Sequence, residues 1–388
     1  MPQSPKVYLD YNASAPIRPE AEQAVLRALV IGGNPSSVHA AGRAARAVME
    51  QARAQVASLV AMPGGSVIFV SGAAEANALA IASAVAAGAR RLVVGATEHE
   101  TVLAAAEASG AAVDVWPVDG HGVADLAWLA GRLVRWDAAD GAPFVALMLA
   151  NNETGVVQPV AEAAALVRAH GGWLHVDAVQ AAGKIAIDMR ALGADTLSLS
   201  AHKLGGPQGV GALVFGNRAR LSRQLHGGGQ ERSMRAGTEN VSGIAGFGAA
   251  AEASERDLAK VSEQAAWRDA AAERLADDLG AVVLGQGAPR LAGTLCFAAE
   301  GFASELQVMQ MDLAGVMVSA GSACSSGKVK PSRVAQAMGR GDLAPYVLRV
   351  SGGWASTEQD WKTFTAAWLK AYAHHGQRQS ARQRQPAA

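Results

Sequence analysis

The sequence predicts an α/β fold, with a large domain built on a mostly parallel sheet and a smaller α/β domain after it. Short apolar runs alternate with amphipathic helical stretches through the first 250 residues, and several runs are almost wholly apolar. Such runs are typical of strands covered on both faces, and their alternation with helices is typical of βαβ units. The chain has 388 residues, of which 50% are hydrophobic, so two domains with sizeable cores are expected.

The elements of the large domain follow from the positions of these runs. The predicted strands are Val67–Val70, Arg91–Gly95, Val113–Trp116, Phe144–Leu149, Trp173–Val176, Thr196–Leu199 and Gly211–Phe215. Helices are predicted at Glu75–Val85, at Thr101–Ala108 and from Val160 to His170, where a Gly-Gly pair provides a C-cap.

The pattern changes near residue 250, where the smaller domain is predicted to begin. Glu255–Leu279 has apolar residues at helical spacing and predicts one long helix. A last helix is expected from Thr357, with Asp360 completing a weak capping box. Between them, short strands are predicted at Val282–Leu284, Gly293–Ala298, Val316–Ser319 and Tyr346–Ser351. We therefore expect a large domain at 12–253, a small domain made of 1–11 and 254–375, and a disordered Gln/Arg-rich tail at 376–388.

Charge and cysteine content restrict the possible partners and the compartment. Lys and Arg together number 34, as do Asp and Glu, so nothing predicts bulk attraction to nucleic acid or to an anionic membrane. No apolar stretch reaches the roughly 18 residues of a membrane span. Two cysteines cannot form a disulfide scaffold for a chain of this size, so we expect a cytoplasmic protein, and we assign no metal ligands.

Lys203 lies in the segment SAHKLGGP, directly after the predicted strand that ends at Leu199. The Gly-Gly-Pro turn leaves little room for a floppy side chain. The lysine is therefore either an exposed residue beside a turn or a Schiff-base lysine whose amine is kept partly neutral by its surroundings. Taken alone, the motif favours the first interpretation.

Asp177 ends an apolar strand in the segment WLHVDAVQ, with no compensating charge close by in the sequence. Open α/β sheets bind ligands at the carboxyl ends of their parallel strands. A carboxylate there can stabilise a protonated pyridine nitrogen, which makes a pyridine cofactor a better electron sink. It can equally cap the next helix, and the segment alone does not separate these interpretations.

Two further polar segments follow predicted strands. Ser71-Gly72-Ala73-Ala74-Glu75 begins a helix, and the free N–H groups at a helix start bind anions, although an ordinary βα turn has the same sequence pattern. His99 follows the strand Arg91–Gly95 and can cover a flat ring or transfer protons, although a single histidine is more often structural.

The two cysteines differ in their neighbours. Cys324 lies in the middle of SAGSACSSG, a segment of small residues that is typical of a thiol on a mobile loop. Cys296 lies in the segment TLCF and has the large apolar neighbours of a buried core cysteine. We therefore assign a chemical role to Cys324 and none to Cys296.

Taken together, these motifs resemble the cysteine desulfurases of the NifS/IscS type, which are class V aminotransferase-like, fold-type I pyridoxal-phosphate enzymes. The resemblance extends from about Tyr8 to about Ser351, and it implies a mostly parallel seven-stranded sheet between helices in the large domain. The motifs occur in family order and are YLDYNASAP (8–16), GNPSSVH (33–39), ATEHETVL (96–103), NNETGVVQP (151–159), HVDAVQ (175–180), SAHKLGGPQGVGAL (200–213), HGGGQERSMRAGTEN (226–240) and SAGSACSSG (319–327).

The resemblance implies a set of residues around the ring of pyridoxal 5'-phosphate. Lys203 would form the Schiff base, Asp177 would pair with the pyridinium nitrogen, and Gln180 would hydrogen-bond the phenolic oxygen. His99 would stack on the ring and transfer protons, and Asn152 would help to position cofactor and substrate.

The same resemblance implies a phosphate site shared between two subunits. Ser200, His202 and the turn at Ala73 and Ala74 would hold the phosphate. Thr238 would reach the phosphate of the neighbouring subunit, so the family implies a homodimer.

On the substrate side, the resemblance implies L-cysteine as the sulfur donor. Arg349 would clamp the substrate carboxylate in a bidentate fork, and Cys324 would be the nucleophile that takes the sulfur as a persulfide. The sulfur would then pass to an acceptor protein, for iron–sulfur cluster, thio-cofactor or thiolated tRNA synthesis.

Four positions depart from the family pattern, two of which are Ala76 and Asn77, where the family usually has Ser-Asp. Ala74 replaces the usual threonine of the phosphate turn and removes one neutral hydrogen bond, typically worth about 0.5–1.5 kcal/mol, so weaker cofactor binding is expected. Trp354 stands where the family often has arginine, which changes the electrostatics expected at the substrate entrance.

Two other kinds of function fit the same motifs. One is another enzyme of the same fold. A class V aminotransferase would not need Cys324, and a selenocysteine lyase would discriminate against cysteine. The other is a non-catalytic scaffold that binds pyridoxal phosphate, for which the change at Ala74 would be an early sign of decay.

Overall fold

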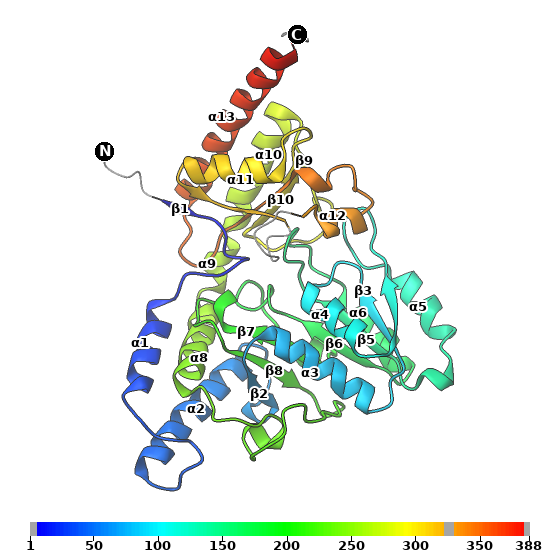
Figure 1. Cartoon of the computed structure of the whole chain (residues 1–388), viewed down its shortest axis with the longest axis vertical. Coiled ribbons are helices and arrows are strands. Elements are labelled where there is room, and N and C mark those ends of the chain that lie inside the picture. Colours follow the sequence, from blue (N-terminus) through cyan, green and yellow to red (C-terminus); the bar gives the residue numbers. More distant parts are fainter. Residues whose placement is uncertain (1–5, 322–329, 384–388) are drawn as a thin grey trace.

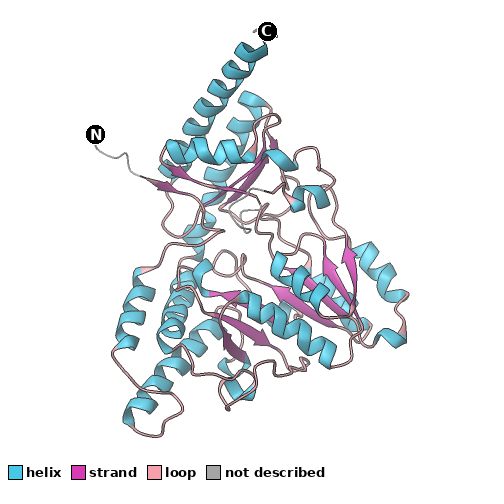
Figure 2. Ribbon diagram, in the orientation of Figure 1, coloured by secondary structure: helices cyan, strands magenta, loops and turns pink. Residues whose placement is uncertain are grey.

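A computed structural model describes residues 6–321 and 330–383, and it forms a large and a small body, each with its own sheet (Figure 1). The strands lie in two separate groups, with helices packed around each group (Figure 2). The predicted nucleophile Cys324 lies outside the described residues, so its position is not tested.

The large body confirms the predicted seven-stranded, mostly parallel sheet. The strand order is β2-β8-β7-β6-β5-β3-β4, and β8 alone among these strands runs in the direction opposite to the other six. All residues of β2, β5 and β7 are buried, as expected for strands covered on both faces. The bounds are β2 Val67–Val70, β3 Arg91–Gly95, β4 Ala112–Trp116, β5 Phe144–Met148, β6 Trp173–Asp177, β7 Thr196–Ser200 and β8 Gly211–Phe215.

The helices around this sheet pack against one another in small groups. Helices α1 and α2 both lie against α8, α3 lies against α4, and α5 lies against α6. No helix within the described ranges is both long and apolar enough to cross a bilayer. The bounds are α1 Pro19–Leu29, α2 Ala40–Ser58, α3 Ala73–Ala86, α4 Glu100–Ala108, α5 Leu126–Val134, α6 Val160–Ala169, α7 Met189–Leu192 and α8 Val241–Arg256, with 3-10 turns η1 Gly64–Ser66, η2 Ala138–Asp140, η3 Ala201–Lys203 and η4 Glu231–Ser233.

The small body has a four-stranded antiparallel sheet, β12-β13-β10-β9, and a parallel pair formed by β1 and β11. Its core joins Val7 and Leu9, from the start of the chain, to aromatic residues such as Phe297, Trp361 and Trp368. The bounds are β1 Val7–Tyr8, β9 Val282–Val283, β10 Thr294–Ala298, β11 Val316–Met317, β12 Ser319–Ala320, β13 Val347–Ser351, α9 Leu258–Ser262, α10 Gln264–Leu279, α11 Ser304–Leu313, α12 Arg333–Ala337, α13 Glu358–Gln383 and η5 Ala344–Tyr346.

Two predicted elements of the second half are divided in the structure. The prediction of one helix over 255–279 was wrong, because α8 ends at Arg256 and α9 and α10 follow it. The break falls at Asp257, whose carboxylate bonds the buried guanidinium of Arg18 at 2.6 Å. The predicted strand at 316–319 is also two strands, of which β11 pairs with β1 and β12 pairs with β13.

The C-terminal helix is longer than predicted. It begins as expected, with Thr357 and Asp360 exchanging the hydrogen bonds of a capping box. It then continues through Gly376 to Gln383, where a disordered tail was predicted, and it projects away from the small body in Figure 1. Gln, Arg and Ala have good helix propensity, so this segment can extend an existing helix without an apolar stripe of its own.

Candidate active site

Five segments with predicted site residues meet at one edge of the large sheet. Strands β2, β3, β5, β6 and β7 run in the same direction, so the segments after their carboxyl ends lie together. These segments carry Ala73, His99, Asn152, Asp177 and Lys203. The structure therefore brings together at this edge residues that are up to 130 positions apart in sequence, 203 − 73.

Lys203 ends the turn η3 and points at the backbone of the N-terminal segment. Its Nζ donates to the carbonyl oxygens of Asn12, at 2.6 Å, and Ala13, at 2.7 Å. The interpretation of Lys203 as an exposed lysine beside a turn is therefore wrong, because its amine is held by two carbonyl groups in a partly buried position.

Asn12 joins several predicted site residues to each other. Its carbonyl oxygen accepts from Gln180 Nε2 at 2.9 Å as well as from Lys203, and its Nδ2 donates to the carbonyl oxygen of Asn152 at 3.2 Å. Its Oδ1 accepts from Lys184 Nζ at 2.6 Å, and the same amine donates to Gln180 Oε1 at 2.8 Å. Burial, together with the positive charges of Lys203 and Arg349, holds the pKa of Lys184 well below its usual value.

Asp177 lies at the end of β6 with its carboxylate buried. Oδ1 accepts from the backbone N–H of Val179 at 3.0 Å, and Oδ2 accepts from Asn77 Nδ2 at 3.0 Å. The first bond fixes the turn that follows the strand, but no helix begins there, because the next helix is α7 and Asp188 caps it. The interpretation of Asp177 as the cap of the next helix is therefore wrong. The second bond orients the carboxylate from α3.

Asn77 connects Asp177 to two histidines. Its Oδ1 bonds Nε2 of the fully buried His175 at 2.9 Å, and its Nδ2 also donates to Thr101 Oγ1 at 3.0 Å. Thr101 Oγ1 lies 3.0 Å from Nδ1 of His99, which also accepts from the Thr101 N–H and caps α4. Burial lowers the pKa of His175 to about 3, so this ring is neutral at physiological pH.

The predicted anion site is the first turn of α3, which begins at Ala73. Gly211 of β8 approaches Gly72 so closely that a Cβ at Gly211 would lie 2.7 Å from the Cα of Gly72. Glu75, in the same turn, bonds Arg235 at 2.7 Å and accepts from the Ser71 N–H at 2.7 Å. Burial opposes ionisation of Glu75, but these two bonds outweigh it and lower its pKa, so Arg235 neutralises a carboxylate that would repel an anion.

The other predicted phosphate residues are distributed around this turn. Ser200 is buried at the end of β7, and His202 Nδ1 lies 3.2 Å from Ser14 Oγ. Burial and the charge of Lys203 lower the pKa of His202 to about 4. Thr238 is exposed and lines a cavity of about 190 Å³ with Ser71 and Arg235, while its contact with a neighbouring subunit stays a prediction.

Arg349 lies on β13 and reaches the site from the small body. It is 2% exposed, and its guanidinium bonds Asp10 at 2.8 Å and the carbonyl oxygen of Asn152 at 3.2 Å. Its Nε is buried without a hydrogen-bond partner. Arg349, which is predicted to bind the substrate carboxylate, thus already binds the Asp10 carboxylate through part of its guanidinium group.

Two residues discussed from the sequence have structural roles. Cys296 is fully buried and burial raises its pKa, which confirms it as a core cysteine. Trp354 stacks under the Arg18 guanidinium, 5.0 Å from the ring centroid, and donates to the carbonyl oxygen of Pro16 at 3.1 Å. Trp354 therefore packs beside the turn after Lys203, where a Cβ on Gly205 would lie 3.1 Å from its Nε1.

Four residues that organise this edge had no role predicted from the sequence: Asp10, Asn12, Asn77 and Lys184. Asp10 and Asn12 lie in the motif YLDYNASAP, which was noted but given no role. Lys184 is a charged residue inside the mostly apolar stretch 181–187, and this contrast was a signal that it lies in a polar part of the interior.

The fold and the arrangement of this edge are those of a fold-type I α/β enzyme, the class to which pyridoxal-phosphate-dependent aminotransferases belong. The comparisons with known proteins identify the family. The family described as aminotransferase class-V matches residues 7–364. The chain therefore belongs to the class-V aminotransferases, within their cysteine desulfurases of the NifS/IscS type.

Similar proteins support this placement over nearly the whole chain. A cysteine desulfurase from Cereibacter sphaeroides is 42% identical over 346 residues, covering 86% of this chain and 87% of the relative. A cysteine desulfurase IscS from Dictyoglomus turgidum is 36% identical, covering 92% and 91%. A NifS-like protein from Rickettsia africae has a solved structure that aligns with a TM-score of 0.87 at 29% identity, covering 95% and 99%. The alternatives of a lyase, another aminotransferase or a scaffold are not favoured by these relatives.

Proposed function

We propose that this protein takes sulfur from L-cysteine, releases L-alanine and keeps the sulfur as a persulfide on Cys324. Relatives named cysteine desulfurases, at 34–42% identity, support the substrate and the product class. The observation that carries the proposal is the buried network that holds Lys203, Gln180 and Asn152 on one residue, Asn12. In the reaction the carbon–sulfur bond of cysteine breaks, a sulfur–sulfur bond forms on the Cys324 thiolate, and a proton replaces sulfur on carbon.

The donor set at the sheet edge fits pyridoxal 5'-phosphate. A partly buried lysine amine, a buried carboxylate and the first turn of α3 offer partners for an aldehyde, a pyridine nitrogen and a phosphate, respectively. Residues that would hold the cofactor are Lys203, Asp177, Gln180, His99, Asn152, Ala73, Ala74, Ser200, His202 and Thr238. When bound, the cofactor supplies an electron sink for the negative charge that develops at the substrate Cα.

Lys203 and Arg349 have complementary tasks in this proposal. The Lys203 amine binds the cofactor and later moves the proton at the substrate Cα, a task for which it must be neutral. Arg349 orients the substrate through its carboxylate, exchanging part of its contact with Asp10 for the ligand. Because Asp10 already balances its charge, the buried guanidinium is stable before substrate arrives.

The wider setting of the reaction is part of the same proposal. A homodimer would bring Thr238 of one subunit to the phosphate of the other, which is consistent with the exposure of Thr238. A reducing, cytoplasmic setting suits a reactive thiol and an acceptor protein that removes its sulfur.

Alanine and sulfide release from L-cysteine, with cofactor and a reductant, tests the proposed function. The wild type is expected to form both products in equal amounts, and Cys324→Ala is expected to form neither. Cys296→Ala is the matched control, because Cys296 is a buried core cysteine, and it should keep the product ratio. Product formation by Cys324→Ala would remove this thiol from the reaction, and a wild type that binds cofactor without turnover would contradict the activity.

A further inference from the structure

Lys184 is a buried lysine to which the proposed reaction gives no task. Its side chain is 8% exposed, and its Nζ donates to Asn12 Oδ1 at 2.6 Å and to Gln180 Oε1 at 2.8 Å. A lysine is rarely buried unless its amine has a specific polar partner. Here the amine donates to two amide oxygens, and both belong to residues that also touch Lys203 or its carbonyl acceptor.

The hydrogen bonds fix which way each amide faces. Asn12 Nδ2 donates to the carbonyl oxygen of Asn152, which can only accept, so Oδ1 must be the atom that faces Lys184. Gln180 Nε2 donates to the carbonyl oxygen of Asn12, so Oε1 likewise faces Lys184. An amide group carries two N–H donors, and the bond to Asn12 uses one of those on Gln180.

We propose that Lys184 is a positioning residue: by holding Asn12 Oδ1 and Gln180 Oε1, it fixes the Gln180 amide so that its second N–H faces the ring oxygen of the cofactor. The inference rests on the proposed function, because it needs pyridoxal phosphate at Lys203. Lys203 and Gln180 are also linked directly, because the Asn12 carbonyl oxygen accepts a hydrogen bond from each of their side chains.

The charges around Lys184 support a role in the site. The nearby charged groups are Lys203, from η3, and Arg349, from β13, which is itself paired with Asp10. Burial is the largest cause of the lowered pKa of Lys184, and Lys203 and Arg349 add to it. Repulsion between two amines favours states in which one of them is neutral, and a neutral Lys184 still has the two N–H donors that its amide partners need.

The test compares Lys184→Met with the wild type in the holoenzyme, each titrated with pyridoxal phosphate. The readout is the pH midpoint at which the visible absorption band of the bound cofactor changes. Without an oriented Gln180 donor, the ring oxygen carries more negative charge and holds its shared proton more tightly. The midpoint is therefore expected to rise by about one pH unit, the size expected for one lost hydrogen bond to a charged group.

Three further variants complete the experiment. Gln180→Ala should raise the midpoint by itself, and should add little in the Lys184→Met background, since both changes remove the same donor. Lys184→Gln keeps a shorter donor for the Asn12 amide, which should preserve folding if methionine does not. Lys362→Met removes an exposed lysine of α13 and is expected to leave the midpoint and the cofactor dissociation constant unchanged.

The outcomes separate this inference from the proposed function. A wild type in which Lys203 binds no cofactor would overturn the proposed function, and with it the role of Lys184. A wild type that binds cofactor, together with a folded Lys184 variant of unchanged midpoint, would overturn the inference alone. Fully additive shifts from the Lys184 and Gln180 variants would also overturn it, because Lys184 would then not act through Gln180.

Discussion

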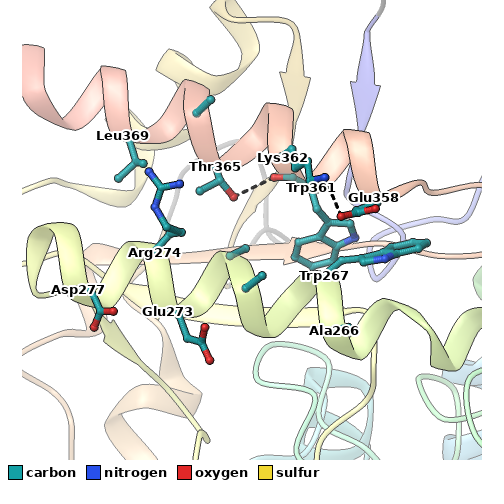
Figure 3. A pocket seen from close by; sticks show the side chains of 13 residues that line it. Ala266, Trp267, Glu273, Arg274, Asp277, Glu358, Trp361, Lys362, Thr365 and Leu369 are labelled. Carbon is teal, nitrogen blue, oxygen red and sulfur yellow. Dashed lines mark hydrogen bonds and ion pairs between the residues drawn. The ribbon is translucent and has the colours of Figure 1, made fainter.

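The candidate active site and the groove between α10 and α13 differ in how their polar groups are used. The groove encloses about 670 Å³ and is lined by alanines together with Trp267, Trp361 and Leu369 (Figure 3). Its ion pair between Lys362 and Glu358 joins two side chains that are more than half exposed. At the sheet edge, by contrast, Asn12, Asn77 and Lys184 are buried and hydrogen-bonded, with Lys184 donating to Asn12 and Asn77 donating to Asp177.

This difference indicates where chemistry takes place in the molecule. Burying a polar group is costly unless it is paired, so a dense buried network is kept only where its orientation matters. The groove is larger than the cavity of about 190 Å³ beside Thr238, but it contains exposed charges that water can solvate. Buried hydrogen bonds, and not cavity size, therefore distinguish the candidate active site from the groove.

The largest effect is expected from replacing Lys203, which lies in the buried network of the sheet edge. Lys203→Ala removes both the covalent attachment point of the cofactor and the base at Cα, so alanine formation should fall by at least 10²–10⁴-fold, the range for a lost general base. The rate is measured with saturating cofactor, and Lys260→Ala, an exposed lysine of α9, is the control that should retain activity. Retained turnover in Lys203→Ala would separate the buried network from catalysis.

The buried, neutral His175 at the sheet edge should make the free energy of unfolding depend on pH, an effect not expected from the exposed ion pair of the groove. Its pKa is about 3 in the folded chain and about 6.5 when exposed, so between these values the unfolded chain binds more protons. Its contribution to stability is complete above pH 6.5 and is lost as the pH falls towards 3. Urea unfolding at pH 7.5, 6 and 5 should therefore show a steeper loss of stability for wild type than for His175→Gln. Parallel curves would mean that His175 is not held neutral.

The smallest effect is expected in the groove. Lys362→Met removes an exposed ion pair within one helix, and such pairs are worth about 0.3–0.5 kcal/mol. The free energy of unfolding should change by no more than that, and turnover should be unchanged. A larger loss of turnover would place the groove in the catalytic cycle and remove the contrast between the two regions.

Much of the sheet edge could be predicted because its signals are local. A buried parallel strand is recognisable from a short apolar run, and the polar residue that ends it marks the edge where ligands bind. Lys203, Asp177 and His99 were found in this way. The division of the helix at Asp257 could not be, since it depends on Arg18, which lies 239 positions away.

The residues that join the site were missed for the same physical reason. Asn12 reaches Ser351, Thr294 and Lys184 across 339, 282 and 172 positions, and no local pattern encodes such pairings. Asn77 is a polar residue in a helix of mostly small apolar residues, and its role follows only from the strand that brings Asp177 beneath it.

The hydrogen bond from the Asn12 N–H to Ser351 Oγ has a consequence for folding during translation. Asn12 organises the candidate active site, but its partner on β13 is synthesised 339 residues later. At synthesis rates of about 5–20 residues per second, the N-terminal segment waits roughly 20–70 s for its place. The large sheet can be complete during that interval, whereas the candidate active site can be complete only after β13 has been synthesised.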